Sequence, residues 1–120
     1  MRIVISSQGD DLEAEVDPRF GRAAQFLLID TESGSFNLIE NNQNLNLPQG
    51  AGIQTAQKIA EQKAEVVLTG NCGPKAFKTL QAAGVKVITG VSGKIKDALK
   101  DYQEGKYQEA SASNVQGHWM

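Results

Sequence analysis

Residues 66–77, which read VVLTGNCGPKAF, decide the predicted fold. The apolar run at their start has the length and composition of a buried strand, and Pro74 suits the first turn of a helix. Between them stand two glycines and Cys72, the only cysteine of the chain. Open α/β sheets bind ligands where a strand ends and a helix begins. The stretch therefore predicts a parallel strand–helix unit and places a candidate site in its loop.

Apolar periodicity extends this pattern along the chain. Short alternating or continuous apolar runs predict strands, and apolar spacings of three and four residues predict helices. On the third strand, Phe36, Leu38 and Glu40 are expected on one face. Predicted strands occupy residues 2–6, 25–30, 36–40, 65–69 and 85–89, and predicted helices occupy residues 51–63, 74–83 and 94–104.

The order of these elements limits the sheet. Turn residues at 31–35 indicate an antiparallel meander of the first three strands, and helical crossovers make the last two strands parallel to the first. We therefore predict an α/β fold of the ribonuclease H-like, three-layer kind. Its mixed five-stranded sheet has the order 3-2-1-4-5, with strand 2 antiparallel and helices on both faces. The loops at residues 6–9 and 70–73 should then meet at one edge.

Length and composition predict a single domain over residues 1–105, followed by a polar C-terminal tail at 106–120. We find no apolar periodicity at 7–17 or in the tail and expect these parts to be the most mobile. A net charge of −2 and a pI near 5.3 provide no basic field for nucleic acid. No stretch has the length of a membrane span, and a single cysteine suits a reducing compartment. We expect a cytoplasmic protein.

Cys72 is the first candidate functional residue. Backbone N–H groups of Gly70, Asn71 and Gly73, together with the helix dipole, are expected to favour its thiolate. The thiolate is the form that binds metal or acts as a nucleophile. A lone cysteine also occurs as a small buried hydrophobe, and both interpretations stay open at this point.

Arg19 and Arg22 form the second candidate group. They flank Phe20, which is expected in the core, in the sequence DPRFGR. Two neighbouring guanidinium groups suit an anionic ligand that has several acceptor oxygens or sulfides. The alternative is that Arg19 pairs with Asp17 while Arg22 caps a carbonyl group.

Several motifs of catalysis and of closed metal sites are absent from the sequence. It contains no dinucleotide or P-loop glycine pattern, and its first strand has no acid for a two-metal nuclease. One cysteine and one histidine cannot complete a closed zinc site. The remaining enzymatic alternative is a Cys72 nucleophile, with His118 as its base, but His118 lies in a polar tail that holds a base poorly.

These stretches resemble the dinitrogenase iron–molybdenum cofactor biosynthesis family, which includes NifX, NafY and the C-terminal domain of NifB. The resemblance is carried by DPRFGRA at 17–23, GAGIQTA at 50–56, TGNCGPKAF at 69–77 and GVKV at 84–87. It implies the ribonuclease H-like fold. It also implies non-enzymatic binding or carriage of an iron–sulfur cluster, or of an iron–molybdenum cofactor or its precursor.

On this resemblance, Cys72 would ligate the metal and His118 could add a nitrogen ligand. Arg19 and Arg22 would surround an anionic cluster, and the loop residues Gly70, Asn71 and Gly73 would also bind the cofactor, aided by loop N–H groups. Few protein ligands leave exchange positions open, which suits transient carriage. A cluster donor or acceptor protein is the expected partner, and the chain is expected as a monomer or weak homodimer. The alternative is a small-molecule or regulatory binding module that uses the same cleft without metal.

Overall fold

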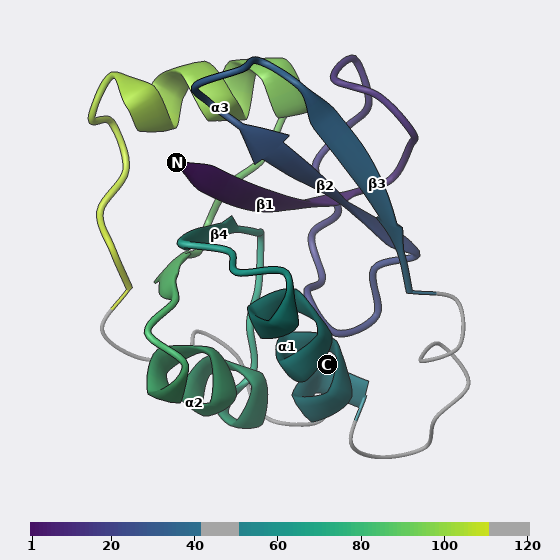
Figure 1. Ribbon diagram of the computed structural model, residues 1–120, viewed down its shortest axis with the longest axis vertical. Coiled ribbons are helices and arrows are strands. Elements are labelled where there is room, and N and C mark those ends of the chain that lie inside the picture. Colours follow the sequence, from purple (N-terminus) through teal and green to yellow (C-terminus); the bar gives the residue numbers. More distant parts are fainter. Residues whose placement is uncertain (42–50, 111–120) are drawn as a thin grey trace.

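The computed structural model describes residues 1–41 and 51–110 (Figure 1). Every predicted element is present there, with bounds within two residues of the predicted ones. None of the helices in these ranges is long and apolar enough to cross a membrane. The strands are β1 (Arg2–Ser7), β2 (Gln25–Asp30), β3 (Phe36–Glu40), β4 (Val66–Leu68) and β5 (Lys86–Ile88). The helices are α1 (Ala51–Glu61), α2 (Pro74–Ala82) and α3 (Ile95–Gln103).

The five strands form one mixed sheet of order β3-β2-β1-β4-β5, as predicted. β1 is central, with β2 antiparallel on one side and β4 parallel on the other. β3 extends the antiparallel side and β5 extends the parallel side. Strand order and direction are therefore confirmed, while the ribonuclease H-like label stays a prediction.

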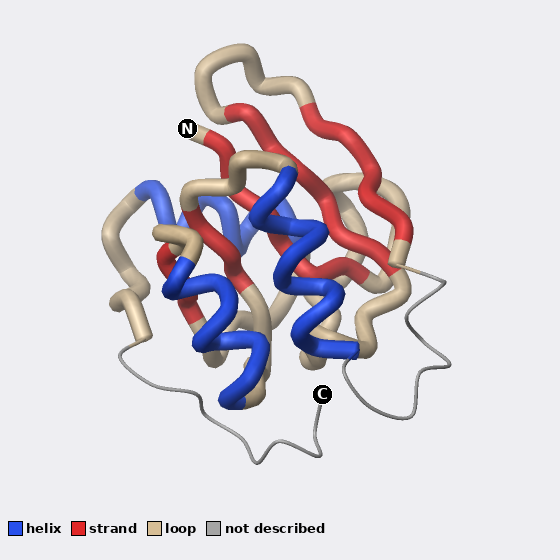
Figure 2. The backbone as a smooth tube through the Cα atoms, turned by 60° about the horizontal axis from the view of Figure 1, so that its bottom comes forward, coloured by secondary structure: helices blue, strands red, loops and turns tan. Residues whose placement is uncertain are grey.

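Helices cover both faces of the sheet. α1 and α2 lie side by side on one face (Figure 2), and α3 lies on the other (Figure 1). Alternate residues of β1 serve the two layers: Val4 packs beneath α1 and α2, whereas Ile3 and Ile5 pack beneath α3. All three are fully buried, and burial of such a side chain is worth roughly 1.5–3 kcal/mol.

Residues 7–17 are attached to the α3 layer. The carbonyl groups of Leu12 and Ala14 accept hydrogen bonds from the first turn of α3, and Val16 donates its N–H to the Gly93 carbonyl at 2.8 Å. Leu12 and Ala14 also pack against the core beneath α3, and Val16 is part of it. The expectation that this stretch lacks apolar periodicity was therefore wrong. Its three apolar residues alternate with acidic ones, and the mobility of the segment stays a prediction.

The chain after α3 returns across the edge of the sheet. Tyr107 packs against the core on the α3 side, whereas Ala110 packs against the core beneath α1 and α2. The Ala110 N–H donates to the Val87 carbonyl oxygen at 2.7 Å, which covers part of β5. The first residues of the predicted tail therefore contact both layers of the domain, and the boundary between domain and tail stays a prediction.

Lys63 provides a test of the end of α1. It follows the helix with a φ of 60°, a left-handed conformation that is unfavourable for a residue with a Cβ atom. We expect Lys63→Gly to raise the free energy of unfolding by about 1 kcal/mol, measured by urea denaturation.

Gln62→Gly is the matched control, because φ is not positive at Gln62. There the added backbone freedom should lower the free energy of unfolding by roughly 0.5–1 kcal/mol. Equal shifts in the two variants would contradict the assignment of strain to Lys63.

Candidate functional site

Two chain segments meet where β1 and β4 end. Residues 17–22, here called the arginine segment, lie against residues 69–73, here called the cysteine loop. Arg19 and Asn71 form a parallel β-bridge, and Phe20 donates its N–H to the Asn71 carbonyl oxygen at 3.0 Å. The loop at residues 6–9 was predicted to meet residues 70–73, but the contacts described for residues 70 and 71 on this side are with the arginine segment, and Ser6 reaches the cysteine loop at Thr69.

Gly70 allows the two segments to touch. A Cβ atom on Gly70 would lie 2.7 Å from both the Cα atom and the carbonyl oxygen of Pro18. The side-chain amide of Asn71 donates to the same carbonyl oxygen at 2.9 Å. Only glycine tolerates so close a backbone approach, so Gly70 acts here through its lack of a side chain.

Buried hydroxyl groups tie the start of the arginine segment to the sheet. Ser6 Oγ donates to the Asp17 carbonyl oxygen at 2.8 Å, and Thr69 Oγ1 lies 2.8 Å from Ser6 Oγ. Because the Ser6 hydroxyl has one proton, the Thr69 hydroxyl donates to Ser6. Both side chains are fully buried, so β1 and β4 together position Asp17.

A second buried pair holds the other end of the segment. The amide of Asn41 donates to the carbonyl oxygens of Ala23 at 2.8 Å and Gly21 at 3.3 Å. Thr55 Oγ1 donates to Asn41 Oδ1 at 3.2 Å, and both residues are fully buried. The sequence alone does not reveal this pair, because a polar residue at a core position becomes a signal only when its neighbours are known.

The arginine side chains lie between these two anchors. Arg19 Nε is 3.9 Å from Asp17 Oδ1, which also accepts the Arg19 N–H at 2.9 Å. The pairing with Asp17 that was considered from the sequence is therefore present, at long range. The Arg19 side chain is still 51% exposed and can contact a ligand, and Arg22 is partly exposed.

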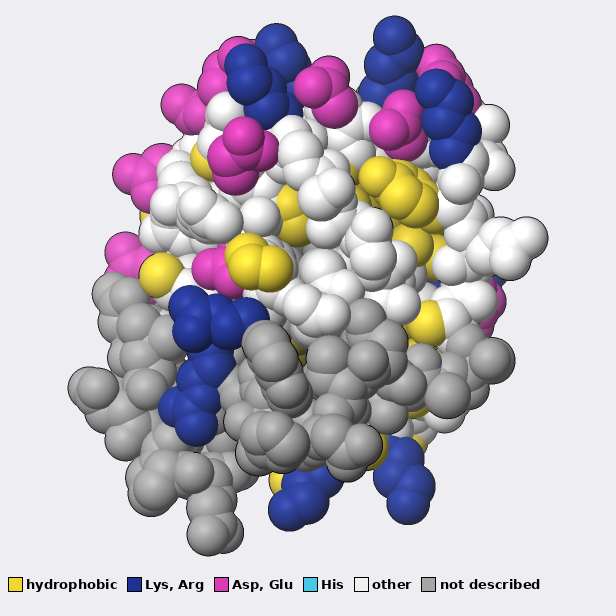
Figure 3. All heavy atoms as spheres, turned by 180° about the vertical axis from the view of Figure 1, so that it is seen from behind, with side chains coloured by type: hydrophobic (Ala, Val, Ile, Leu, Met, Phe, Trp, Pro, Cys, Tyr) yellow, Lys and Arg dark blue, Asp and Glu magenta, His cyan; other side chains and the backbone are white. Residues whose placement is uncertain are grey.

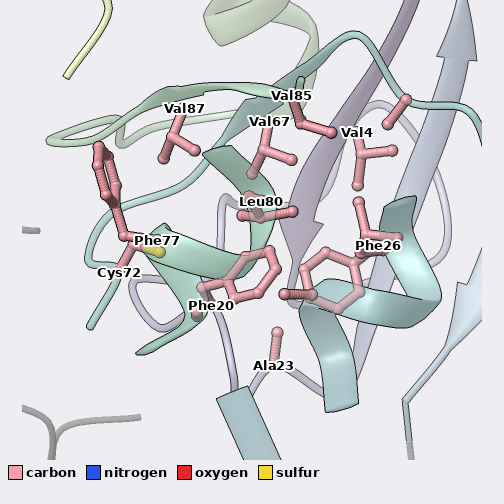
Figure 4. Close-up of a cluster of buried hydrophobic side chains, with 14 of the residues drawn as sticks. Val4, Phe20, Ala23, Phe26, Val67, Cys72, Phe77, Leu80, Val85 and Val87 are labelled. Carbon is pink, nitrogen blue, oxygen red and sulfur yellow. The ribbon is translucent and has the colours of Figure 1, made fainter. Parts of the chain in front are cut away.

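Cys72 belongs to the core. It is fully buried in the cluster that contains Phe20, Ala76 and Phe77, and Figure 4 shows its sulfur directed into that cluster. Burial raises the pKa of its thiol from 9.0 to about 12. The expectation that the loop favours the thiolate was therefore wrong. The cause of the raised pKa is the loss of hydration around the sulfur, which disfavours the charged thiolate.

The end of the molecule that holds α2 is basic. Gly73 precedes the helix without a side-chain cap, and Lys75 and Lys78 on α2 are exposed. In Figure 3, acidic and basic side chains alternate near α3 at the top, whereas the described charged side chains at the bottom are Lys or Arg. An anion is therefore more favourable near α2 than near α3.

The described residues do not form a metal centre. Within residues 1–41 and 51–110, no group of three or more His, Cys, Asp and Glu side chains could hold a metal ion. Cys72 is a single buried thiol, and the predicted ligand His118 lies outside the described residues. The described residues therefore provide too few metal-binding side chains to hold a metal–sulfur cluster by protein ligands alone.

A surface cavity of about 140 Å³ lies elsewhere, near the start of β1. The carboxylate of Asp30 in this cavity already accepts N–H groups from Glu32 and Ser33. The cavity therefore does not coincide with the predicted site. It is lined by Arg2, Leu28, Asp30, Ser35 and Asn37.

Known proteins are similar to this chain in sequence and in fold. Residues 1–105 match the family described as dinitrogenase iron–molybdenum cofactor. An uncharacterised protein of Methanocaldococcus jannaschii is 29% identical over 97 residues, covering 78% of this chain and 81% of that protein. The apo form of the orange protein from Desulfovibrio gigas has a TM-score of 0.93 and 40% identity, covering 95% of this chain and 96% of that chain. A Thermotoga protein of the DUF35 family, provisionally named as NifB, has a TM-score of 0.83 and 35% identity, covering 97% and 98%.

Gly70→Ala tests the close approach at the site. Its Cβ atom would push the backbone of Pro18 away, so we expect the free energy of unfolding to fall by roughly 1–3 kcal/mol. NMR spectra should show displaced amide signals for Arg19 and Phe20. Gly34→Ala is the comparison: its Cβ atom meets nothing within 4 Å, but its φ is +76°, so it should lose about 1 kcal/mol through backbone strain and leave the Arg19 and Phe20 signals in place. Unchanged Arg19 and Phe20 signals in Gly70→Ala would contradict the proposed contact.

The pH dependence of stability tests the burial of Cys72. The folded state keeps the thiol proton up to about pH 12, whereas the unfolded chain releases it near the ordinary pKa of 9.0. The stability from this group is therefore complete below about pH 9 and is lost as the pH rises towards 12. Relative to Cys72→Ala, we expect the free energy of unfolding to fall by up to about 1.4 kcal/mol per pH unit in that window. If the free energy of unfolding, measured by urea denaturation, depended equally on pH in both proteins, burial of a protonated thiol would be refuted.

Proposed function

Because the chain belongs to the dinitrogenase iron–molybdenum cofactor family, we propose that it binds an anionic metal–sulfur cofactor or its precursor without catalysing a reaction. The observation that supports this most is the arginine segment, which is held at both ends and lies against the cysteine loop. Arg19 pairs with Asn71, shortly before α2 begins, and Arg22 follows in the same segment. A site arranged before binding loses little freedom when the ligand arrives.

The proposed contacts are charges and hydrogen-bond donors. Guanidinium groups of Arg19 and Arg22 would face the anionic surface of an iron–sulfur or iron–molybdenum cluster. Backbone N–H groups in the first turn of α2 would add donors. The Asn71 amide, which donates to the Pro18 carbonyl oxygen, would hold the loop in place rather than contact the cluster.

Direct ligation by Cys72 is the less favourable form of this proposal. A thiolate ligand must lose its proton and reach the surface, and burial of Cys72 opposes both steps. Contact through arginines and N–H groups requires neither step. His118 lies outside the described residues, and its role as an additional metal ligand stays a proposal.

A metal-free binding module is the second candidate. The absence of a metal-ligand cluster within the described residues favours it, because the same arginines would bind any small polyanion. With either candidate, we propose that the chain is cytoplasmic and works with a donor or acceptor protein. The two candidates differ in whether metal accompanies the bound anion.

Anaerobic reconstitution with iron, sulfide and molybdate tests the proposal. We expect the wild-type chain to acquire visible absorption bands and protein-bound metal after gel filtration. The double variant Arg19→Gln/Arg22→Gln should bind at least about tenfold less, because two charge-assisted contacts are lost. Cys72→Ala should retain most of the bound metal.

The control Arg2→Gln/Lys86→Gln removes two positive charges from the opposite end of the parallel strands, where β1 and β5 begin. It should bind as the wild type does. Loss of metal in Cys72→Ala, but not in the arginine variant, would establish thiolate ligation instead. Absence of metal in every protein, with molybdate or phosphate binding retained by calorimetry, would favour the metal-free module.

A further inference from the structure

The exposed large apolar side chains of the described residues gather on one face of the sheet. They are Met1 at 42%, Phe36 at 38% and Leu38 at 40% exposure, and we call them the β3 patch. Phe36 lies opposite Ile29 and Leu38 lies opposite Leu27, so each pair shares a face of the antiparallel sheet. Ile29 and Leu27 belong to the core beneath α3, and the Met1 sulfur is 3.9 Å from a tyrosine hydroxyl of α3. The patch therefore continues the α3 face beyond the helix.

The outer edge of β3 offers unused backbone groups. Ser35 accepts a hydrogen bond from β2 at 2.9 Å, and Asn41 donates one at 2.9 Å to the residue before β2. Residues alternate along an antiparallel strand, so the odd-numbered residues between them face β2. The N–H and C=O groups of Phe36 and Leu38 therefore point away from the sheet. Within residues 1–41 and 51–110, no hydrogen bond reaches them.

Carboxylates flank the patch at both ends of the strand. Glu40 is on the same face as the patch, opposite Gln25, whose amide donates to Asp10 Oδ1 at 2.9 Å. Glu32 lies beyond the other end, and its side chain is 88% exposed. The N-terminal amino group, 3.9 Å from Glu32, is its ion-pair partner among the described residues. An apolar strip between acidic ends is complementary to an apolar strip between basic ends.

We propose that β3 accepts an extended segment of a partner protein as an additional antiparallel strand. Main-chain hydrogen bonds to Phe36 and Leu38 would hold the segment, and its alternate apolar side chains would cover the β3 patch. Lys or Arg residues at its two ends would face Glu40 and Glu32. The Glu40 carbonyl already accepts a hydrogen bond from Lys58 Nζ, so the new pairing centres on Phe36 and Leu38.

A second copy of the chain fits this edge less well. Two β3 strands aligned antiparallel about Leu38 would bring Glu40 of each copy towards the Glu32 end of the other. Like charges at both ends oppose that pairing, whereas basic residues in a partner segment favour binding there. This inference concerns the edge of the sheet and does not rest on cofactor binding by the arginine segment.

The probe is the synthetic peptide acetyl-KTVTVTK-amide, added to the ¹⁵N-labelled full chain. We expect saturable NMR shifts on β3 with a midpoint on the order of 1 mM. The Phe36 and Leu38 amides should become protected from hydrogen exchange, whereas Asn37 and Ile39 should change little because they already face β2. Added salt should weaken binding. The control peptide acetyl-ETVTVTE-amide should bind at least about fivefold more weakly.

Leu38→Lys and Asn37→Lys form the matched pair of variants. Each adds one positive charge on β3, but only the former places it on the face of the patch. We expect Leu38→Lys to weaken peptide binding by about tenfold and Asn37→Lys to change it by less than about threefold. Absence of peptide-dependent shifts at about 5 mM, or equal binding of both peptides, would overturn the proposal. A concentration-dependent dimer that is lost in Leu38→Lys would also overturn it, in favour of a second copy.

Discussion

The close approach of Gly70 to the backbone of Pro18 is the constraint on which the rest of the site depends. Because no Cβ atom separates the two chains, the arginine segment can bond to the cysteine loop through Asn71. The same approach delivers Phe20 to the core, where its ring centre lies 5.3 Å from that of Phe26. One backbone contact thus joins the packing of the domain to the placement of the arginines.

In this arrangement the arginine charges and the Cys72 thiol lie in different environments. Polar anchors at Ser6 and Asn41 hold the arginine segment at the surface, while Cys72 packs among aromatic and aliphatic side chains. A buried thiol keeps its proton, because water no longer stabilises the thiolate. The half-exposed Arg19 side chain and the buried sulfur of Cys72 therefore lie in different environments of the candidate site.

The proposed partner strand and the candidate site use different parts of one sheet. The site lies where the parallel strands β1 and β4 end, whereas β3 forms the edge on the antiparallel side. The proposed strand would pair with Phe36 and Leu38, neither of which belongs to the arginine segment or to the cysteine loop.

The sequence by itself determined the elements, their order and the sheet topology, because apolar periodicity and crossover rules depend on residues close together along the chain. It also singled out residues 17–22 and 69–73 as candidate functional segments, but it named the loop at 6–9, and not residues 17–22, as the neighbour of the cysteine loop. Only the tertiary structure decided that the sulfur of Cys72 points into the core, that Asn41 and Thr55 anchor the arginine segment, and that residues 7–17 attach to α3. These features depend on neighbours distant in sequence, which determine the burial of a side chain and the hydrogen bonds that its polar atoms form.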